Sequence, residues 1–505
     1  MSAVSATSRG ITWERLAAHV SKLSLRRRIG IVATVGLVGG LVAALPAGAV
    51  ATPLPDFASV EQVVGAPQAW AANATGAGVD VAVLDTGVTP VAGLSDPTKI
   101  LYGPDLSFDS QDPNAAYLDN FGHGTAIASI IAGNDGTPGG FQGVAPNARI
   151  VSVKVGSRTG AVDVSQIIAG IDWVVQHAHD PGVNIRVLNL SLGTTSMQSY
   201  LIDPLAQAAE NAWRHGIAVV TSAGNDGTTN NSVADPATDP YLIAVGAEDP
   251  VGTVTPTDDV LPGFSQRGTG SRHPDLVAPG AYIMGLNVPG STLATQYPNA
   301  VFGRFIRGSG TSQAAAIVSG AVADMLSVNP NLTPDQVKAA LTQSASRISV
   351  NNPNFVGAGL LNIPGALAVP PSTSRQMWAP AMGTGSLEAA RGNAHIAYNG
   401  VTLTGEQDVF GNSWVPSVMV PAEQSATAWN GGVWNRGTWT GATWSSVTWS
   451  SVTWSSVTWS SVTWSSVTWS SVTWSSVTWS SVTWSSVTWS GDMWASGVWA
   501  SNDWA

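Results

Sequence analysis

A nine-residue stretch, GSGTSQAAA, runs from Gly308 to Ala316 and constrains this chain more than any other part of its sequence. Gly308 and Gly310 permit backbone turns that residues with side chains resist, so the stretch predicts that the hydroxyl of Ser312 is presented rather than packed. Small and apolar residues follow at helical spacing, and a helix N-terminus favours negative charge that develops beside it. The stretch therefore predicts a serine nucleophile at the start of a buried helix. Such a nucleophile needs a base, a group that orients the base, and donors for an oxyanion.

A carboxylate that can orient a base follows a short apolar run early in the chain. Residues 79–84 (VDVAVL) predict a buried strand, and the tripeptide DTG at 85–87 closes it with a turn that exposes Asp85. Aspartic proteases also use DTG, but they need a second such carboxylate, and the sequence has no other DTG or DSG. We therefore interpret Asp85 as the orienting group.

The candidate base is His123, which lies between two glycines in the segment DNFGHGTAIASIIAG. A single histidine is often structural. The flanking glycines, however, allow neighbouring backbone to approach closely, and a small-residue helix is predicted to begin here. Asp85 and Ser312 still need a base to accept the serine proton, and an imidazole can do this, so we assign His123 as the general base.

Predicted strands and helices alternate through the middle of the chain. Strands are expected at 148–155, 185–193 and 217–225, and helices at 163–178 and 204–216. This alternation predicts an α/β fold with a parallel sheet flanked by helices on both faces, in which site residues gather at the carboxyl ends of strands. Asp85, Gly193 and Asn225 all fall at such ends. Asn225 is either a turn cap or a carboxamide donor for an oxyanion.

The segments VAVLDTGV, GHGT, NLSLG, SAGNDG, PDLVAPG and GSGTSQAAA, in this order, resemble the subtilisin family of serine endopeptidases. The resemblance covers residues 60–368 and implies the subtilisin-like parallel-sheet fold. It implies an Asp-His-Ser triad of Asp85, His123 and Ser312, with Asn225 and the Ser312 backbone N–H as the oxyanion hole. The family pattern has Met after the nucleophile and Pro-His soon after, where this chain has Gln313, Ala316 and Ile317. These departures lie in the helix rather than in the triad.

The resemblance also predicts how peptide or protein substrates bind. Ser191, Leu192 and Gly193 form an edge to which a substrate adds as a strand, through main-chain hydrogen bonds. Ala223 and Gly224, with Ala234, resemble the lining of a roomy and mostly apolar primary pocket, which implies broad specificity for large apolar residues. Asp235 next to them is the alternative, since its charge would attract a basic side chain. The Asp235–Pro236 bond matches a position that is cis in relatives.

No cofactor is expected for the chemistry, and the metal content is left open. Three acidic residues in PDLSFDSQDPN (Asp105, Asp109 and Asp112) suggest a structural calcium site, although their spacing fits no strict loop motif and a solvated loop is the alternative. The net charge of −11 argues against a nucleic-acid partner. The absence of cysteine excludes a thiolate nucleophile, disulfides and a thiolate zinc site.

The N-terminus has the pattern of an export signal. Three arginines at 26–28 precede an apolar run from Ile29 to Leu45 and the small-residue stretch AGAVA, which predicts a signal peptide over 1–51. A membrane anchor over the same run is the alternative. Residues 52–59 form a short lead with no room for an inhibitory pro-domain, so we expect folding without one. The protein is predicted to be secreted, outside the cell or associated with the cell wall.

Two further regions follow the catalytic domain. Residues 369–428 are predicted to be a linker with a small segment that resembles those beside actinobacterial exported proteases, and Asn399-Gly400 in it marks a β-hairpin. From Trp429 to the C-terminus at 505, Trp recurs every five residues, with nine successive WSSVT units. This repeat predicts a β-solenoid with a coil of about 20 residues, a disordered low-complexity tail, or a module that contacts cell wall or carbohydrate. A non-catalytic adhesion protein that uses this repeat is the alternative function for the whole chain.

Overall fold

The computed structural model describes residues 57–227, 232–268, 272–373, 375–398 and 401–439, with the backbone of four short strands between 457 and 485. The predicted signal peptide, most of the short lead after it and most of the Trp repeat lie outside the described residues. The described part of the lead begins helix α2 (Phe57–Val64), whose Phe57 and Val60 side chains are buried in the main core.

The centre of the described fold is a parallel sheet of seven strands, in the order β2-β3-β1-β4-β5-β6-β7. These strands are β1 (Asp80–Asp85), β2 (Ile100–Asp105), β3 (Arg149–Lys154), β4 (Ile185–Leu190), β5 (Ala218–Ser222), β6 (Ile243–Glu248) and β7 (Leu276–Pro279). Every residue of β1 is buried, because helices cover both faces of the sheet. The predicted parallel α/β architecture is confirmed.

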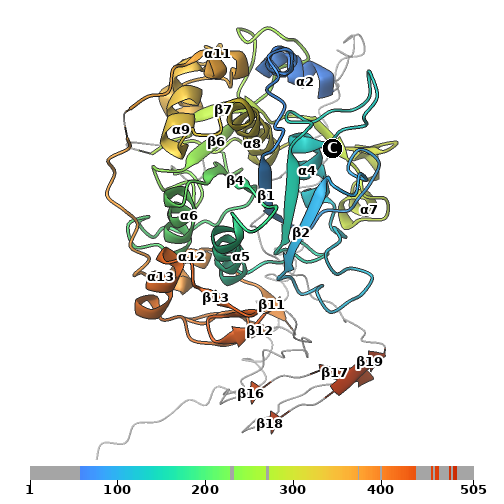
Figure 1. Ribbon diagram of the computed structural model, residues 1–505, viewed down its shortest axis with the longest axis vertical. Coiled ribbons are helices and arrows are strands. Elements are labelled where there is room, and N and C mark those ends of the chain that lie inside the picture. Colours follow the sequence, from blue (N-terminus) through green and yellow to red (C-terminus); the bar gives the residue numbers. More distant parts are fainter. Residues whose placement is uncertain are drawn as a thin grey trace, which may run out of the picture. The chain divides into compact units, whose positions relative to one another are not determined.

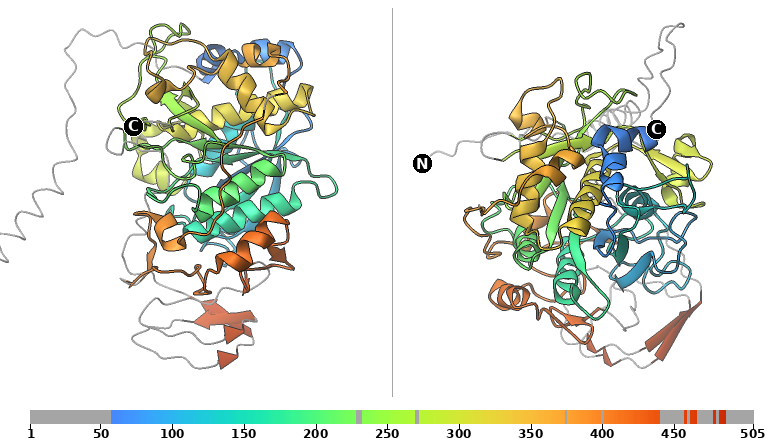
Figure 2. Two further views of the ribbon diagram at one scale, coloured as in Figure 1. Left: turned by 90° about the vertical axis from the view of Figure 1, so that its left-hand side faces the viewer. Right: turned by 45° about the horizontal axis from the view of Figure 1, so that its top comes forward.

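Two pairs of helices cover the two faces of this sheet (Figures 1 and 2). Helices α4 (His123–Ala132) and α8 (Thr311–Val328) pack on one face, and α5 (Val164–His177) and α6 (Pro204–Arg214) on the other. Neighbouring residues of β1 point to opposite faces. Leu84 lies against Gly170 of α5, whereas Asp85 points to α4. The last residue of β1 therefore faces the two helices whose first turns contain the predicted base and nucleophile.

A small antiparallel sheet leads the chain into α8. Strands β8 (Ile283–Leu286), β9 (Val301–Phe302) and β10 (Phe305–Gly308) form it, in the order β8-β10-β9. Gly285 lies so close to α4 that an added methyl carbon would be 3.0 Å from the Cα of Ala126. Shorter helices complete this part of the fold: α3 (Ala66–Ala71), α7 (Thr292–Gln296), η1 (Pro298–Ala300), α9 (Pro334–Ser344), α10 (Pro353–Val356) and α11 (Ile363–Ala368).

The region predicted as linker and hairpin packs against α5 and α6. It contains α12 (Leu387–Arg391), β11 (Ala397–Tyr398), β12 (Val401–Thr402) and α13 (Pro416–Gln424). Strands β11 and β12 pair antiparallel on either side of 399–400, so the predicted hairpin is confirmed. The buried side chain of Arg391 reaches Asp163 at the start of α5, with 2.7 Å between Nε and the carboxylate.

The first three Trp residues of the repeat also belong to this packed unit. Strands β13 (Trp429–Asn430), β14 (Val433–Trp434) and β15 (Gly437–Thr438) form an antiparallel sheet. The indole N–H of Trp429 donates to the Ala169 carbonyl at 2.8 Å, and that of Trp434 donates to the Asp172 carboxylate at 2.7 Å. Trp439 is buried beside Trp434, with ring centroids 5.1 Å apart. The start of the repeat is thus anchored on α5.

Further along the repeat, four short strands pair in parallel. Strand β16 (Val457–Thr458) pairs with β18 (Val477–Thr478), and β17 (Ser461–Ser465) with β19 (Ser481–Ser485). Val457 lies opposite Val477 and Ser461 opposite Ser481, a separation of 20 positions in each pair. This is the coil length expected of the β-solenoid alternative, which stays a prediction for the repeat as a whole. Within the described residues, no helix is both long and apolar enough to cross a membrane.

Candidate active site

Asp85 and His123 form a fully buried pair at the carboxyl end of β1. The Nδ1 atom of His123 is 2.8 Å from Oδ1 and 2.9 Å from Oδ2 of Asp85. Both residues are 0% exposed. The Asp85 carboxylate also accepts the backbone N–H of Thr86 at 2.7 Å, which fixes its orientation. The carboxylate thus has the position needed to select the imidazole tautomer with a proton on Nδ1.

The two glycines beside His123 make this pairing sterically feasible. Gly122 precedes helix α4 at φ 107, a left-handed conformation that glycine adopts without strain. Gly124 lies against β1, where an added methyl carbon would be 2.2 Å from the Gly87 carbonyl and 3.0 Å from the Asp85 carboxylate. Only a residue without a side chain lets the first turn of α4 approach the strand so closely.

Asp119 holds the start of α4 in place, and sequence reasoning missed it. Its buried carboxylate accepts the backbone N–H groups of Gly122 and Thr125, each at 2.7 Å, and the hydroxyl of Thr86 at 2.8 Å. The Thr86 hydroxyl in turn accepts the N–H of Gly124 at 3.0 Å. Burial raises the pKa of Asp119. An acidic residue just before a predicted helix was the available signal, because such residues satisfy free N–H groups at helix starts.

Ser312 is the second residue of α8, as predicted, but the structure corrects its exposure. The residue is 0% exposed, and its hydroxyl donates to the Ser191 carbonyl at 2.9 Å. The Ser191 hydroxyl donates back to the Ser312 carbonyl at 3.1 Å. Gly310 has φ 170, which is extended backbone open to any residue, so no left-handed turn lifts Ser312 outward. The side chain is instead packed against the predicted substrate edge.

Asn225 lies beside the N-terminus of α8. Its Oδ1 atom accepts both the backbone N–H and the hydroxyl of Thr311, each at 3.0 Å. The Thr311 hydroxyl also accepts the N–H of Gly224 at 3.2 Å. Thr311 directly precedes the predicted nucleophile, so the Asn225 carboxamide is held next to it. The turn after β5 and the start of α8 thereby meet, as expected for groups at the carboxyl ends of parallel strands.

Comparison with known proteins identifies the family. The family model "Subtilase family" matches residues 76–366, which include Asp85, His123, Asn225 and Ser312. The chain belongs to the subtilase family. It is thus a serine-type endopeptidase by family.

Individual relatives agree with this. Over 296 residues the chain is 36% identical to serine protease AprX of Bacillus subtilis (strain 168), which is 57% of this chain and 66% of that relative. It is 34% identical to Subtilisin Savinase of Lederbergia lenta over 299 residues, which cover 59% of this chain and 94% of that relative. Among solved structures, fervidolysin from Fervidobacterium pennivorans, a keratinolytic enzyme related to subtilisin, matches with a TM-score of 0.50 and 29% identity. The match covers 62% of this chain and 46% of fervidolysin.

Three of the residues predicted to bind substrate in this subtilase, Gly193, Ala223 and Gly224, come together around Ala234. An added methyl carbon at Gly193 would lie 3.1 Å from the Ala234 Cβ, and one at Gly224 would lie 3.0 Å from it. Ala223 accepts the backbone N–H of Ala234 at 2.8 Å. The side chains of Leu192 and Ala223 are fully buried.

Two neighbours refine the prediction for the primary pocket. Sequence reasoning missed Gln266, whose Oε1 would lie 2.1 Å from a methyl carbon added at Gly224. No local signal marks it, because the contact joins distant segments. Asp235 is 0% exposed and accepts the Thr238 hydroxyl at 2.7 Å. Burial, and then the nearby Asp203, raise the pKa of Asp235 well above its ordinary value. The Asp235–Pro236 bond is cis, as predicted.

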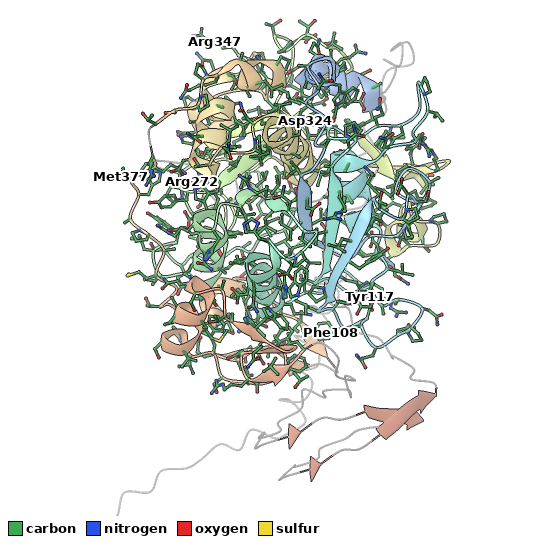
Figure 3. The ribbon with its side chains drawn as sticks, viewed as in Figure 1. Phe108, Tyr117, Arg272, Asp324, Arg347 and Met377 are labelled. Carbon is green, nitrogen blue, oxygen red and sulfur yellow. The ribbon has the colours of Figure 1, made fainter. Side chains whose placement is uncertain are left out.

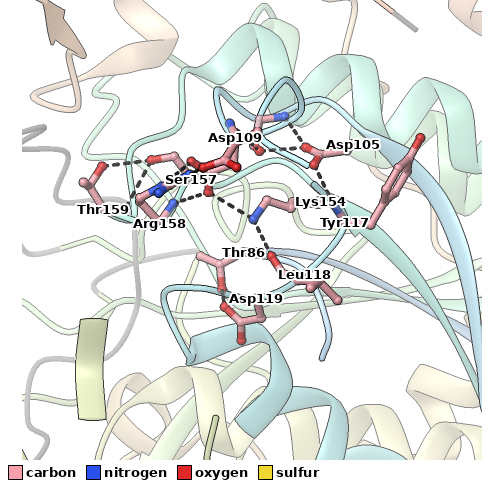
Figure 4. A network of polar contacts seen from close by, with 12 residues as sticks. Thr86, Asp105, Asp109, Tyr117, Leu118, Asp119, Lys154, Ser157, Arg158 and Thr159 are labelled. Atoms are coloured by element: carbon pink, nitrogen blue, oxygen red, sulfur yellow. Dashed lines mark hydrogen bonds and ion pairs between the residues drawn. The ribbon is translucent and has the colours of Figure 1, made fainter. Parts of the chain in front are cut away.

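The three acidic residues considered for calcium all bind donor groups of the protein itself, and Figure 4 shows two of them, Asp105 and Asp109. Asp109 is paired with Lys154 at 3.2 Å and with Arg158 at 3.1 Å, and Asp112 with Arg158 at 2.5 Å. Asp105 accepts the Ser107 hydroxyl at 2.6 Å and the Tyr117 N–H at 2.8 Å. Two cationic side chains inside the cluster repel a further cation. The carboxylates therefore do not fit a calcium site, and no other acidic cluster with metal-binding geometry occurs among the described residues.

Proposed function

We propose that the protein is an exported serine endopeptidase that cleaves peptide bonds through Asp85, His123 and Ser312 and an acyl-enzyme intermediate. The buried contact of 2.8 Å between Asp85 and His123 is the observation that carries this proposal. A histidine in that position can accept a proton on Nε2 while the carboxylate stabilises the imidazolium that results.

In the acylation step, the Ser312 hydroxyl exchanges its bond to the Ser191 carbonyl for one to His123 Nε2. The Oγ atom attacks the carbonyl carbon of the scissile peptide bond as its proton passes to Nε2. The carbonyl oxygen becomes an oxyanion, which the Ser312 backbone N–H and the Asn225 carboxamide stabilise. Collapse of the tetrahedral intermediate breaks the C–N bond, and His123 gives its proton to the leaving amine.

Deacylation repeats the sequence with water. His123 takes a proton from a water molecule, whose oxygen attacks the acyl carbon bound to Ser312 Oγ. The same oxyanion donors act again, and the proton then returns from His123 to Oγ as the new carboxyl group leaves. Since each step restores the proton that the previous one removed, the chemistry needs no cofactor.

Protein and peptide segments are the proposed substrates. Residues 191–193 bind the substrate main chain, so affinity depends little on sequence. Ala223 and Gly224 then line a mainly apolar primary pocket that gives broad specificity. The burial of Asp235 favours the apolar pocket over attraction of a basic side chain, because its carboxyl is 0% exposed and burial raises its pKa, which disfavours the charged form.

Export is part of the proposal. The arginine-preceded apolar run before residue 51 supports secretion, outside the cell or on its wall. The Trp repeat is proposed as a β-solenoid appendage, and its contact with cell wall or carbohydrate stays a prediction. A mature protein that begins near Thr52 is the expected result of N-terminal sequencing.

Active-site labelling tests the proposed chemistry. The purified full-length protein should react with a fluorophosphonate probe, and the Ser312→Ala variant should not. Ser327→Ala is the matched control, because Ser327 is near the other end of the same helix and its hydroxyl donates to the Asp324 carbonyl. Labelling of Ser312→Ala at the rate of the unaltered protein, or no labelling of either, would refute the proposal.

A further inference from the structure

The segment of residues 376–393, here called the C-terminal strap, lies outside the matched family region, which ends at 366. It runs along the loop of residues 194–203, which directly follows the proposed substrate edge. The strap donates main-chain hydrogen bonds to this loop: Met382 N–H to the Leu201 carbonyl at 2.8 Å, and Gly385 N–H to the Ile202 carbonyl at 2.6 Å. Two segments almost 200 residues apart in the sequence are therefore joined through their backbones.

Side chains of the loop fix the rest of the strap. Gln198 makes two bonds to Ser386, accepting its N–H at 2.8 Å and donating to its carbonyl at 3.2 Å. Thr195 accepts the N–H of Asn393 at 2.9 Å. Gly392, at φ 56, leaves no space for a side chain, since an added methyl carbon would be 2.6 Å from the Ser196 nitrogen. The contact is thus close along the length of the loop.

Thr194 connects the strap to the substrate edge. Its N–H donates to the Asp235 carbonyl at 2.8 Å, and its carbonyl accepts the Asp235 N–H at 3.0 Å. This pair places Ala234 between Gly193 and Gly224. The buried hydroxyl of Thr194 donates to the Ala390 carbonyl of the strap at 2.6 Å and accepts the Ser196 N–H of its own loop at 3.3 Å. Thr194 therefore makes both the backbone pairing with Asp235 beside the proposed pocket and the side-chain bond to the strap.

Arg391 fixes the strap where Thr194 reaches it. Its fully buried guanidinium donates to the Asp163 carboxylate at 2.7 Å and to the Glu388 carboxylate at 2.9 Å. It also donates to the carbonyls of Gly405 at 2.7 Å and Gln407 at 2.5 Å. A planar guanidinium with partners on several sides allows little movement of its own backbone. The neighbouring Ala390 carbonyl is accordingly a fixed acceptor.

We propose that the C-terminal strap sets the position of the substrate-binding edge, with Thr194 as the positioning residue that transmits its support. This inference rests on the proposed endopeptidase function and deepens it, because it assigns substrate binding to a part of the chain outside the family domain. The hydrogen bonds of Thr194 within the described residues go to Asp235, Ala390 and Ser196, and none goes to the proposed triad. Loss of Thr194 should therefore weaken main-chain binding of extended peptides and spare the chemistry at Ser312.

The test compares Thr194→Val, which keeps the shape but removes the hydroxyl, with Thr194→Ser, which keeps the hydroxyl. For peptide substrates that extend over the edge, KM of Thr194→Val should rise about fivefold, the equivalent of one neutral hydrogen bond. The rate of Ser312 labelling by a small fluorophosphonate should stay within about twofold, because that probe makes no main-chain contact with the edge. Thr194→Ser should restore KM. Thr342→Val is the matched control, since the Thr342 hydroxyl donates to the carbonyls of Lys338 and Ala339 in its own helix, α9.

Three results would overturn the inference: an unchanged KM in Thr194→Val, an equal defect in Thr194→Ser, or a parallel fall in the labelling rate. Hydrogen exchange gives a readout that does not depend on catalysis. The amides of residues 197–203, which do not donate to the Thr194 hydroxyl, should exchange faster in Thr194→Val than in Thr342→Val, and equal exchange would contradict the proposed support. Failure of the unaltered protein to react with the fluorophosphonate would refute the endopeptidase function itself, whatever the exchange rates.

Discussion

His123 owes its position to residues that exchange no proton with it. Gly124 allows α4 to approach β1, and the Asp119 carboxylate satisfies the N–H groups at the helix start. Thr86 bonds to both Asp85 and Asp119, so the orienting carboxylate and the start of the helix share one network. A change in any of these residues should therefore act on catalysis through geometry, and the chemical role of each site residue has to be tested one at a time.

Asn225→Ala tests the oxyanion assignment. Loss of one oxyanion donor costs about 3 kcal/mol of transition-state stabilisation, so kcat should fall roughly 100- to 1000-fold with little change in KM. Thermal unfolding should show that the variant still folds. Asn147→Ala is the control, because the Asn147 amide bonds to Thr75 at an exposed position and its loss should leave kcat unchanged. If Asn225→Ala were fully active, Asn225 would not be an oxyanion donor.

Asp324 predicts a pH dependence of stability. This residue lies on α8 (Figure 3) and is 0% exposed, and neither carboxyl oxygen has a hydrogen-bond partner in the described part of the chain. Burial raises its pKa well above the ordinary value. In the unfolded chain the carboxyl ionises above about pH 4, whereas in the folded chain it stays neutral. Folding therefore loses stability as the pH rises above that value, up to the raised folded pKa.

Asp324→Leu removes this ionisation and should raise the free energy of unfolding by about 1–3 kcal/mol at pH 8, the range for removing a buried, unpaired polar group. At pH 4 the gain should be smaller, since the unfolded carboxyl is then largely protonated. Thermal unfolding of both proteins at the two pH values measures the difference. A gain that is equal at both, or larger at pH 4, would contradict the assigned origin.

At the scale of elements, the sequence predicted what local patterns determine. The strand before Asp85, the helix after Asp163 and the helix from Pro204 occur as expected, because continuous apolar runs and helical spacing report burial directly. Residues such as Gln266 and Thr194 were not foreseen as part of the site. Their roles depend on contacts with segments far away in the sequence, which no local pattern encodes. For the same reason the exposure of Ser312 was predicted wrongly, since its partner is the Ser191 carbonyl.

Gly124→Ala tests how closely α4 must approach β1. The added methyl group would overlap the Gly87 carbonyl, so the first turn of α4 and His123 must move. A displacement of about 1 Å at a catalytic group can cost on the order of 100-fold in rate, so kcat and the fluorophosphonate labelling rate should both fall to that extent. Gly263→Ala is the control, because a methyl group there meets no atom within 4 Å. Full activity of Gly124→Ala would show that the approach is not required.

On the scale of the whole molecule, the packed unit does not end where the family domain ends. The region from 375 to 439 covers α5 and α6, and its Trp residues reach deep into the contact. The Asp172 carboxyl lies under this cover with its pKa raised to about 8 by burial, and Trp434 donates to it. A buried carboxyl needs such a donor, because an unpaired polar group inside the protein is costly. The first Trp residues of the repeat thus have a structural role in the packed unit.

The buried position of the first Trp residues predicts different results for two changes in the repeat. Truncation after Thr440 keeps Trp429, Trp434 and Trp439 and should leave both the midpoint of thermal unfolding and small-peptide hydrolysis unchanged. Trp434→Ala in the full-length chain removes a buried indole and the donor to Asp172, and should lower the free energy of unfolding by about 3–5 kcal/mol. Unfolding curves with hydrolysis of a short peptide check both changes. If truncation after Thr440 abolished hydrolysis, the later repeats would belong to the catalytic unit. If Trp434→Ala were as stable as the unaltered protein, the contact of the repeat with α5 would not contribute to the free energy of unfolding.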